Sequence, residues 1–399
     1  MKRTYFIAGS AAVIGRAIAN PVLAQSRQTV TLPFPGGQRE LAAFPQKRPL
    51  IVLTSRPVQL ETPSAVFDDG EFTPNDAFFV RWHLPNIPTQ IDPAAFRVRI
   101  RGAVEQPTEF ALDELKTRFA AVDVNAVLEC AGNSRAFSSP RVPGGQWANG
   151  AMGNARWRGI RLRDLLAQVK PQAGAIAVRF EGAERPALPV TPQFQKSLKL
   201  DVATDPNVIL AYQMNGADLP VLNGYPLRLI VPGYFGTYWV KALNDIEVLT
   251  EPDDNYWMKT AYRVPDTPNY SVAPTDTGFA TVPLSKLTIR SFITNVSDGA
   301  ALTPGKTTIR GIAFDGGSGV RGVGFSSDGT ATWRDATLGS DLGRFSFRRW
   351  TATFDAQPGR EYLLASRATN ADGEQQVDRW NPSGYARNAV ETVRVAVGA

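Results

Sequence analysis

The chain of 399 residues contains a single cysteine, Cys130, and a single histidine, His83. One cysteine excludes an intrachain disulfide framework, and the two residues are too few for a zinc site built from several Cys and His ligands. The fold must therefore be stabilised by hydrophobic burial, for which 43% hydrophobic and 10% aromatic residues are sufficient. At this length we expect the core to be divided between two or three domains.

The N-terminus is typical of an export signal. Lys2 and Arg3 precede a mildly apolar stretch, residues 5–15, and small residues at 22–24 offer a cleavage point. We predict residues 1–25 to be a signal for export to the periplasm, with an ordinary N-terminal helix as the alternative. The basic pair favours export of the folded protein by a twin-arginine-type route, although Lys2 stands where that signal has arginine. No stretch reaches the ~18 apolar residues of a membrane-spanning helix, so no membrane partner is expected.

The remaining sequence changes texture along its length. Residues 26–75, rich in proline and glutamine, are predicted to wrap a surface rather than form a core, whereas residues 76–260 mix strand and helix patterns. Residues 263–285 contain four prolines and mark a boundary, after which short strands alternate with turns. The predicted fold is α+β and strand-rich, with a catalytic domain at 26–280 and an immunoglobulin-like β-sandwich at 281–399.

Individual elements follow from the same patterns. Alternation over residues 96–100 predicts a strand, residues 111–119 and 161–169 have helical spacing, and the apolar run 125–128 predicts a buried strand that enters a small-residue turn at 129–133. The predicted strands of the last domain are Thr307–Phe314, Arg321–Phe325, Thr330–Trp333, Phe345–Thr353, Tyr362–Ala368 and Val393–Val397.

Several common functional classes are excluded. A net charge of +6 without any Lys/Arg-rich run gives no basis for nucleic-acid binding. The sequence has no strand–G-x-G-x-x-G–helix unit, no G-x-S-x-G elbow and no C-x-x-C-H heme attachment motif. Gly299 and Gly305 resemble a phosphate loop, but five residues separate them where four are required. Any special chemistry must use the remaining polar residues or a cofactor.

Two short segments carry candidate chemistry. Arg81 and His83 lie two residues apart, on one face of an extended segment, and Cys130 follows the predicted buried strand with Arg135 five positions later. Taken separately, these residues also fit hydrogen-bonded scaffolding and a buried, inert cysteine. Taken together, the arginines are suited to binding oxyanions and a thiolate is suited to a redox metal. Because one protein ligand cannot hold a metal tightly, the metal would arrive chelated by an organic cofactor.

At this level the sequence resembles the sulfite oxidase family of molybdopterin enzymes over nearly the entire chain beyond the predicted signal. The strings that carry the resemblance are Phe79-Val80-Arg81-Trp82-His83-Leu84-Pro85, Glu129-Cys130-Ala131-Gly132-Asn133, Gly150-Ala151 with Ala155-Arg156-Trp157, Leu210-Ala211-Tyr212-Gln213-Met214-Asn215-Gly216, Pro226-Leu227-Arg228-Leu229-Ile230-Val231-Pro232-Gly233, and, in the last domain, Ser327-Asp328-Gly329 with Trp333 and Trp380-Asn381-Pro382. These ordered matches are more specific than any single motif.

The resemblance implies a set of site residues. Cys130 would ligate molybdenum, and Arg81, His83, Arg135 and Tyr262 would surround the substrate oxyanion. The implied cofactor-binding residues are Phe79, Val80, Arg81, Trp82, His83, Cys130, Glu184, Asn223, Arg228, Trp239, Val240 and Lys241. Asn223 is a departure, because several relatives carry a histidine at this position; asparagine can donate a hydrogen bond but cannot carry charge.

The resemblance also implies a function: oxidation of sulfite to sulfate at a molybdenum–molybdopterin centre, with electrons passed singly to a c-type cytochrome. It is closest to the bacterial periplasmic sulfite dehydrogenases. No heme is expected in this chain, so the cytochrome would be a separate protein or a tightly bound heme subunit, and the C-terminal sandwich would form a homodimer. The alternatives are another molybdopterin oxotransferase, such as a sulfoxide or nitrate reductase, and a non-catalytic exported binding protein.

Overall fold

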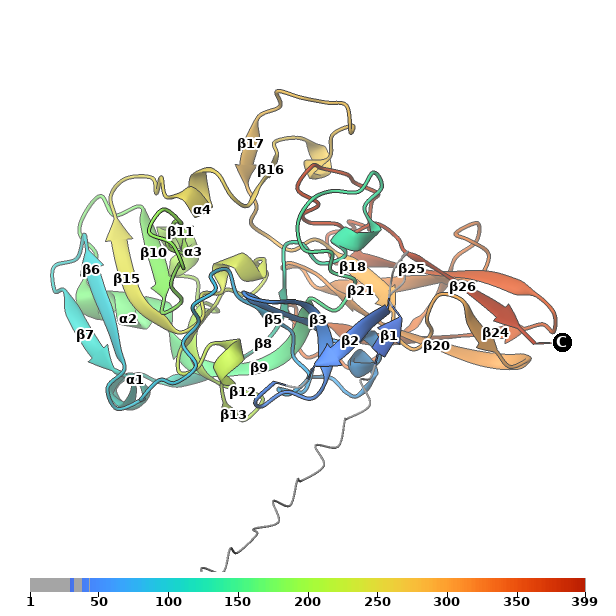
Figure 1. The fold of residues 1–399 in the computed structure, drawn as a ribbon, viewed down its shortest axis with the longest axis horizontal. Coiled ribbons are helices and arrows are strands. Elements are labelled where there is room, and N and C mark those ends of the chain that lie inside the picture. Colours follow the sequence, from blue (N-terminus) through green and yellow to red (C-terminus); the bar gives the residue numbers. More distant parts are fainter. Residues whose placement is uncertain (1–28, 32–37, 43, 399) are drawn as a thin grey trace, which may run out of the picture.

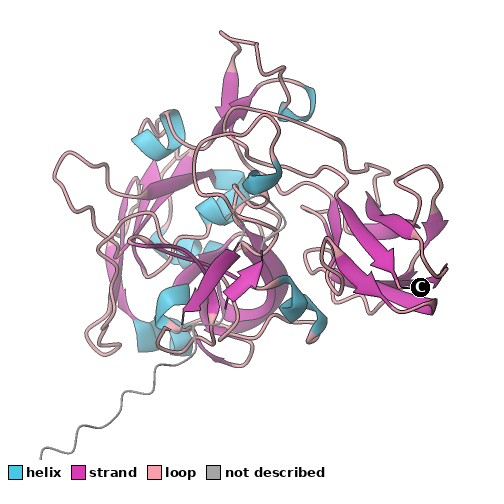
Figure 2. Cartoon of the chain, turned by 45° about the vertical axis from the view of Figure 1, so that its right-hand side comes forward, coloured by secondary structure: helices cyan, strands magenta, loops and turns pink. Residues whose placement is uncertain are grey.

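A computed structural model describes residues 29–31, 38–42 and 44–398; the predicted signal at 1–25 lies outside the described residues. The chain forms a larger N-terminal part and a smaller C-terminal part (Figure 1). Strands run through both parts, whereas the helices lie in the N-terminal part and its projecting arm (Figure 2). The predicted strand-rich α+β fold is confirmed.

The first sheet is built from the segment predicted to wrap a surface. Its five antiparallel strands follow in sequence order, and Leu50 and Leu60 are fully buried in a small core with Trp82. The prediction of a surface-wrapping segment without a core is therefore wrong for residues 50–61, which contribute buried apolar residues to this sheet. The strands are β1 (Thr29–Thr31), β2 (Gln38–Ala42), β3 (Leu50–Ser55), β4 (Val58–Glu61) and β5 (Val80–Arg81).

Two further sheets complete the N-terminal part. One has the order β11-β10-β15-β6-β7, with β15 and β6 parallel; the other has the order β13-β12-β9-β8, with β14 also paired to β12. The strand predicted at 96–100, the helices predicted at 111–119 and 161–169, and the buried strand leading to residue 129 are confirmed. The elements are β6 (Arg97–Gly102), β7 (Thr108–Ala111), α1 (Leu112–Arg118), β8 (Ala121–Glu129), β9 (Met152–Arg161), α2 (Leu162–Val169), β10 (Ala177–Gly182), β11 (Gln195–Lys199), α3 (Leu200–Ala203), β12 (Ile209–Met214), β13 (Ala217–Asp218), β14 (Arg228–Ile230) and β15 (Leu243–Leu249).

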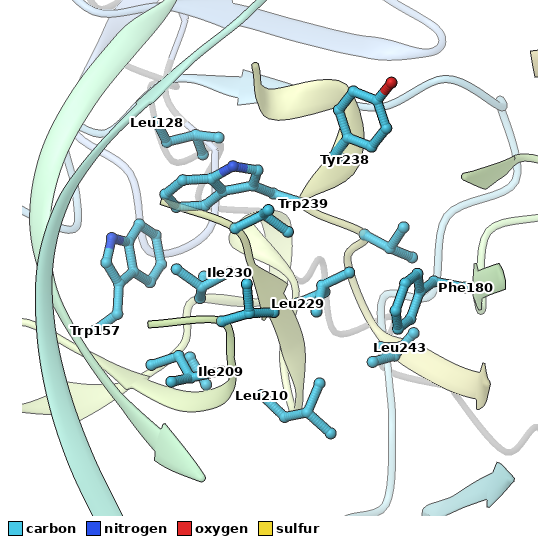
Figure 3. Close-up of a cluster of buried hydrophobic side chains, with 14 of the residues drawn as sticks. Leu128, Trp157, Phe180, Ile209, Leu210, Leu229, Ile230, Tyr238, Trp239 and Leu243 are labelled. Carbon is cyan, nitrogen blue, oxygen red and sulfur yellow. The ribbon is translucent and has the colours of Figure 1, made fainter. Parts of the chain in front are cut away.

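The main core lies where these two sheets meet. Figure 3 shows Trp157 from β9 and Ile209 from β12 facing the same cluster as Leu229 from β14. Trp239 packs edge-on against Trp157, with ring centroids 5.7 Å apart. The segment that follows β14 is therefore held in the core by large aromatic side chains, which makes it a rigid support for the neighbouring loops.

Short helical turns and a projecting hairpin connect the sheets to the C-terminal part. Strands β16 and β17 form a two-stranded arm that projects from the body (Figure 1). Because β16 and β17 pair with each other, this arm spans the predicted domain boundary at residue 280. The connecting elements are the helix α4 (Tyr256–Lys259), the strands β16 (Arg263–Pro265) and β17 (Thr281–Pro283), and the 3₁₀ turn η5 (Pro268–Tyr270). Four further 3₁₀ turns lie in loops of the N-terminal part: η1 (Ser64–Asp68), η2 (Arg135–Phe137), η3 (Val221–Asn223) and η4 (Gly236–Tyr238).

The C-terminal part consists of two sheets, ordered β18-β20-β24-β23 and β19-β26-β25-β21-β22, which enclose a core around Trp350 and Leu364. Most strands lie where the sequence predicted them. The strand predicted at Thr330–Trp333 is wrong, because this segment is a turn in which Asp328 accepts hydrogen bonds from Thr332. The strands are β18 (Arg290–Ile293), β19 (Ala300–Leu302), β20 (Gly305–Phe314), β21 (Val320–Ser326), β22 (Arg334–Asp335), β23 (Thr337–Leu338), β24 (Arg348–Ala356), β25 (Glu361–Asn370) and β26 (Thr392–Val397).

The two parts share a packed interface. Phe67 of η1 makes edge-on contacts with Phe292 and Phe347 of the sandwich, and Arg310 forms an ion pair with Asp68 at 2.9 Å. The C-terminal part is thereby held against the loops that precede β5. Among the described residues, no helix combines the length and apolar character that crossing a membrane would need.

Candidate active site

A hollow lies where the C-terminal ends of β5 and β8 approach the loops around β14. It contains about 410 Å³ of space free of protein atoms, including its open mouth. Eight of the predicted site residues line it: Phe79, Arg81, His83, Cys130, Asn223, Arg228, Lys241 and Tyr262. The fold thus gathers residues that are separated by up to about half of the chain.

Cys130 is presented by a tightly bonded turn at the end of β8. Its backbone N–H donates to the Ala151 carbonyl at 2.9 Å, and its own carbonyl accepts from the Asn133 N–H at 2.9 Å. The Asn133 side chain bridges this turn, accepting from the Ala151 N–H and donating to the Glu129 carboxylate. Only 9% of the surface of Cys130 is exposed, yet the residue still lines the hollow. This is the placement that a ligand to a bound metal requires.

Polar atoms without partners surround the same space. Among the described residues, Arg81 Nη1, Arg228 Nε and Thr237 Oγ1 are buried and make no hydrogen bond. Because buried polar groups are nearly always hydrogen-bonded in native proteins, these orphaned donors indicate a missing polar ligand. Two of the three are cationic, so the expected ligand carries negative charge. A cofactor with a phosphate and a thiol-ligated metal satisfies both the orphaned donors and Cys130.

His83 is held in its neutral form. Its Nε2 lies 2.7 Å from the Tyr262 hydroxyl, and its ring stacks on Phe194 at a centroid distance of 3.5 Å. Burial, together with the positive charges of Arg81 and Lys241, holds the pKa of His83 well below its usual range. Burial also raises the pKa of Tyr262. The two groups therefore form a neutral pair that can pass a proton without creating a lasting charge.

Glu184 does not line the hollow but fixes the segment that does. Its carboxylate accepts hydrogen bonds from the backbone N–H groups of His83 and Leu84, at 3.0 and 2.8 Å. One carboxylate oxygen is 3.8 Å from His83 Nδ1. Glu184 was expected to contact the cofactor; in the structure its carboxylate anchors the loop after β5.

One end of the hollow is strongly basic. Burial lowers the pKa of Arg228 to about 9 and that of Lys241 to about 7. The Lys241 ammonium sits over the Trp82 ring at 4.6 Å, and Arg228 Nη1 donates to the Asn223 carbonyl at 2.8 Å. These buried cations are suited to the phosphate of a pterin cofactor, whose charge would restore their ionised forms.

Arg135 lies elsewhere than expected. Its guanidinium donates to the carbonyls of Ser383 and Gly145 and lies 5.0 Å from the Tyr385 ring. Tyr385 in turn stacks on Tyr262 at 5.3 Å. A Cβ at Gly132 would approach the guanidinium to 2.7 Å, so a side chain there would displace Arg135. Arg135 is thus not among the residues that line the hollow. Tyr385, from the C-terminal part, lies between its guanidinium and Tyr262.

The other predicted cofactor contacts do not line the hollow but are buried in the hydrophobic cores next to it. Val80 and Trp82 belong to the small core of the first sheet, and the Trp82 indole donates to the Leu222 carbonyl at 3.0 Å. Trp239 and Val240 are buried in the main core. A further set that was not predicted lines or borders the site: Lys47, Leu128, Ala131, Phe194, Lys196, Leu222, Gly236, Thr237 and Tyr385. Of these, Ala131 stands in the string that carries Cys130, and the others carry no local motif.

Comparison with known proteins identifies the family. Residues 83–257 match the oxidoreductase molybdopterin binding domain. The chain is 33% identical to sulfite oxidase from Gallus gallus over 377 residues, covering 90% of this chain and 80% of that protein. This chain belongs to the sulfite oxidase family. It is also 29% identical to sulfite oxidase from Arabidopsis thaliana, with 91% of this chain and 98% of that protein covered.

The fold of this sulfite oxidase family member is shared by a solved enzyme. The structure of the sulfane dehydrogenase SoxCD from Paracoccus pantotrophus superposes with a TM-score of 0.75 over 97% of this chain and 93% of that chain, at 23% identity. Within the part of the chain that the structure describes, no three or more His, Cys, Asp or Glu side chains gather into a group that could hold a metal ion. A molybdenum–molybdopterin cofactor fits the hollow through Cys130, the orphaned donors and the basic end.

Proposed function

We propose that this protein oxidises sulfite to sulfate at a molybdenum–molybdopterin centre bound in the hollow. The observation that carries the proposal is the only thiol of the chain, Cys130, lining one space with Arg81, His83 and Tyr262. The cofactor, when bound, supplies the two-electron redox change. The protein's own contribution is to bind, orient and neutralise a small dianion and to manage protons.

Arg81 is the residue best placed to bind the substrate. Its Nη1 is buried and without a partner among the described residues, so an arriving oxyanion would satisfy an existing donor. Hydrogen bonds to charged groups are worth about 1.5–3 kcal/mol each, and low polarity around the site strengthens the attraction. Arg135 would act at longer range, by polarising the stacked pair of Tyr385 and Tyr262.

The pair of His83 and Tyr262 would handle the protons. Conversion of sulfite and water to sulfate releases two protons and two electrons. The 2.7 Å contact between His83 Nε2 and the Tyr262 hydroxyl offers a route along which one proton at a time would pass, because the lowered pKa of His83 keeps the imidazole from retaining it. Since Glu184 fixes the backbone of His83, the imidazole can change its protonation without moving the loop.

The electron acceptor and the cellular setting belong to the same proposal. We propose that a c-type cytochrome receives the two electrons singly, either as a soluble protein or as a tightly bound heme subunit. The basic N-terminal segment supports export to the periplasm by a twin-arginine-type route. The C-terminal sandwich is proposed as the surface for a homodimer. The alternative function is another oxotransferase of the family, such as a sulfoxide reductase.

Three measurements on the purified protein test the proposal together. We expect one molybdenum and one pterin per protein chain. We also expect the protein to reduce cytochrome c rapidly when sulfite is added. Cys130→Ser is expected to lose molybdenum and activity while remaining folded, with Ser138→Ala as a control on a nearby loop. Molybdenum-loaded protein that reduces a sulfoxide but leaves sulfite unchanged would decide for the alternative. Protein that binds neither metal nor pterin in a cofactor-competent host would refute both.

A further inference from the structure

Lys47 is a buried cation that contacts the wall of the hollow from outside the family-matched region. It lies between β2 and β3, before residues 83–257, and only 7% of its surface is exposed. Its Nζ donates to the carbonyls of Asn75 and Phe78, at 2.6 and 2.9 Å, and to the side-chain oxygen of Asn223. All three partners are neutral oxygens. The ammonium therefore enters the interior without a hydrogen-bonded carboxylate.

The contact with Lys47 fixes the orientation of the Asn223 amide. The amide oxygen accepts from the ammonium, while the amide nitrogen donates to the Phe79 carbonyl at 2.9 Å. The two neighbours agree, because the opposite orientation would place an N–H against the ammonium and two oxygens against each other. Asn223 lines the hollow, so its second N–H is the part of the amide that is left for an anion there.

The charge of Lys47 acts on the same wall. Burial lowers its pKa to about 7, and the positive charge of Arg228 contributes to this shift. Asp76, the carboxylate that opposes the shift, is half exposed and forms its own pair with Arg48 at 2.8 Å. Arg228 donates to the backbone carbonyl of Asn223, so two cations converge on one asparagine. An uncompensated pair of buried cations favours binding of an anion beside them.

We propose that Lys47 is a positioning residue for the phosphate-bearing end of the molybdopterin cofactor, acting through Asn223. It turns the amide N–H toward the anion and supplies the positive charge that an asparagine lacks at this position. The inference rests on the cofactor of the proposed function but not on the identity of the substrate. It assigns a cofactor role to a residue outside the domain that defines the family.

The experiment compares cofactor binding with intrinsic stability in the full-length protein. Lys47→Met removes the charge, Lys47→Gln keeps a hydrogen-bond donor, and Arg48→Gln is the control, because Arg48 is adjacent but pairs at the surface. Each variant is prepared in cofactor-loaded form and, from a host that makes no molybdopterin, in cofactor-free form. The readouts are pterin retained after extensive dialysis, measured by fluorescence after oxidation, and the difference in Tm between the two forms.

We expect both Lys47 variants to lose pterin roughly tenfold faster than the wild type, in line with loss of one charge-assisted contact, and to show a smaller Tm difference. Arg48→Gln should match the wild type. Adding Asn223→His to Lys47→Met should slow the loss again, because imidazole supplies its own donor.

A purely structural lysine would lower the Tm of both forms equally and leave pterin loss unchanged, which would overturn the inference. Failure of both cofactor-free variants to fold would do the same. Because pterin is measured directly, a protein with normal cofactor retention but no sulfite oxidation would contradict the proposed function and leave this inference in place.

Discussion

Two clusters of buried cationic side chains in this protein differ in whether carboxylates of the protein pair with them. Arg290, 1% exposed, forms ion pairs with Glu129 at 3.2 Å and Glu391 at 2.8 Å. Glu391 also pairs with Arg387 at 2.7 Å, so two arginines face two carboxylates. At the basic end of the hollow lie Arg228 and Lys241, with Lys47 behind them. Among the described residues, Glu184 is the buried carboxylate whose charge acts on this group, through Lys241.

The difference distinguishes a scaffold from a binding site. The Arg290 cluster joins the turn that carries Cys130 to the C-terminal sandwich, and carboxylates of the protein match its charges, although Arg290 Nε makes no hydrogen bond. Burial still raises the pKa of Glu129, although Arg290 opposes the shift. At the hollow the protein leaves positive charge unmatched by carboxylates, a cost that an anion supplied from outside would offset. Removing a cation should therefore have opposite consequences in the two places.

The largest effect is expected for Arg290→Met. It leaves Glu129 and Glu391 without their buried partner, and breaking such a pair typically costs about 3–5 kcal/mol of folding free energy. Denaturant unfolding of the cofactor-free protein measures the change, with Arg290→Lys as a control that keeps the charge. A loss below about 1 kcal/mol would show that the cluster is not a scaffold.

Arg228→Met is expected to behave in the contrasting way. Cofactor-free protein should change by less than about 1 kcal/mol, because relief of an uncompensated charge offsets one lost hydrogen bond to Asn223. The cofactor-bound protein should lose about 1.5–3 kcal/mol of the stabilisation that the cofactor confers. Parallel thermal unfolding of the two forms tests this. Equal losses in both forms would remove the distinction between the clusters.

The pH dependence sharpens the same comparison. Lys47 has a folded pKa of about 7, below the ordinary 10.5, so between these values the unfolded chain holds a proton that the folded chain has released. Stability therefore rises with pH over this window, by up to about 1.4 kcal/mol per pH unit in the cofactor-free protein. Urea unfolding from pH 7 to 9, wild type against Lys47→Met, should reveal this slope. An identical slope in the variant would assign the titration to other groups.

The smallest expected effect is that of Tyr262→Phe. It removes the hydroxyl that contacts His83 but preserves the rings stacked on Tyr385. A net contribution of about 0.5–1.5 kcal/mol corresponds to a two- to thirteenfold loss in kcat/KM for sulfite. Steady-state kinetics with Tyr385→Phe as the matched control measures it. Equal losses in the two variants would mean that the hydroxyl of Tyr262 has no special part.

The sequence predicted elements whose pattern is local and missed those that depend on distant partners. Helices α1 and α2 and strand β6 were found because their apolar spacing is regular. Residues 50–61 form a sheet because β3 pairs with β4, and β4 with β5, which a proline-rich local sequence does not reveal. Residues 330–333 have strand-like composition, but the Asp328 side chain holds them in a turn.

The candidate site divides in the same manner. Arg81, His83 and Cys130 were predicted from short strings and Tyr262 only from the family resemblance, and all four line one hollow. Arg135 was predicted from its place five positions after Cys130, yet it turns toward Tyr385, a residue 250 positions away in sequence. Lys47 could not be predicted, since its importance arises from a contact with Asn223, 176 positions along the chain.

The sequence alone determined that this chain has one thiol, that the thiol ends a buried strand, and that the chain resembles one enzyme family. It determined these because motif identity and apolar periodicity are properties of neighbouring residues. The tertiary structure decided which cations are matched by carboxylates and which are left for an anionic ligand. Charge balance is a property of the space around a side chain, and only the packing of distant segments defines that space.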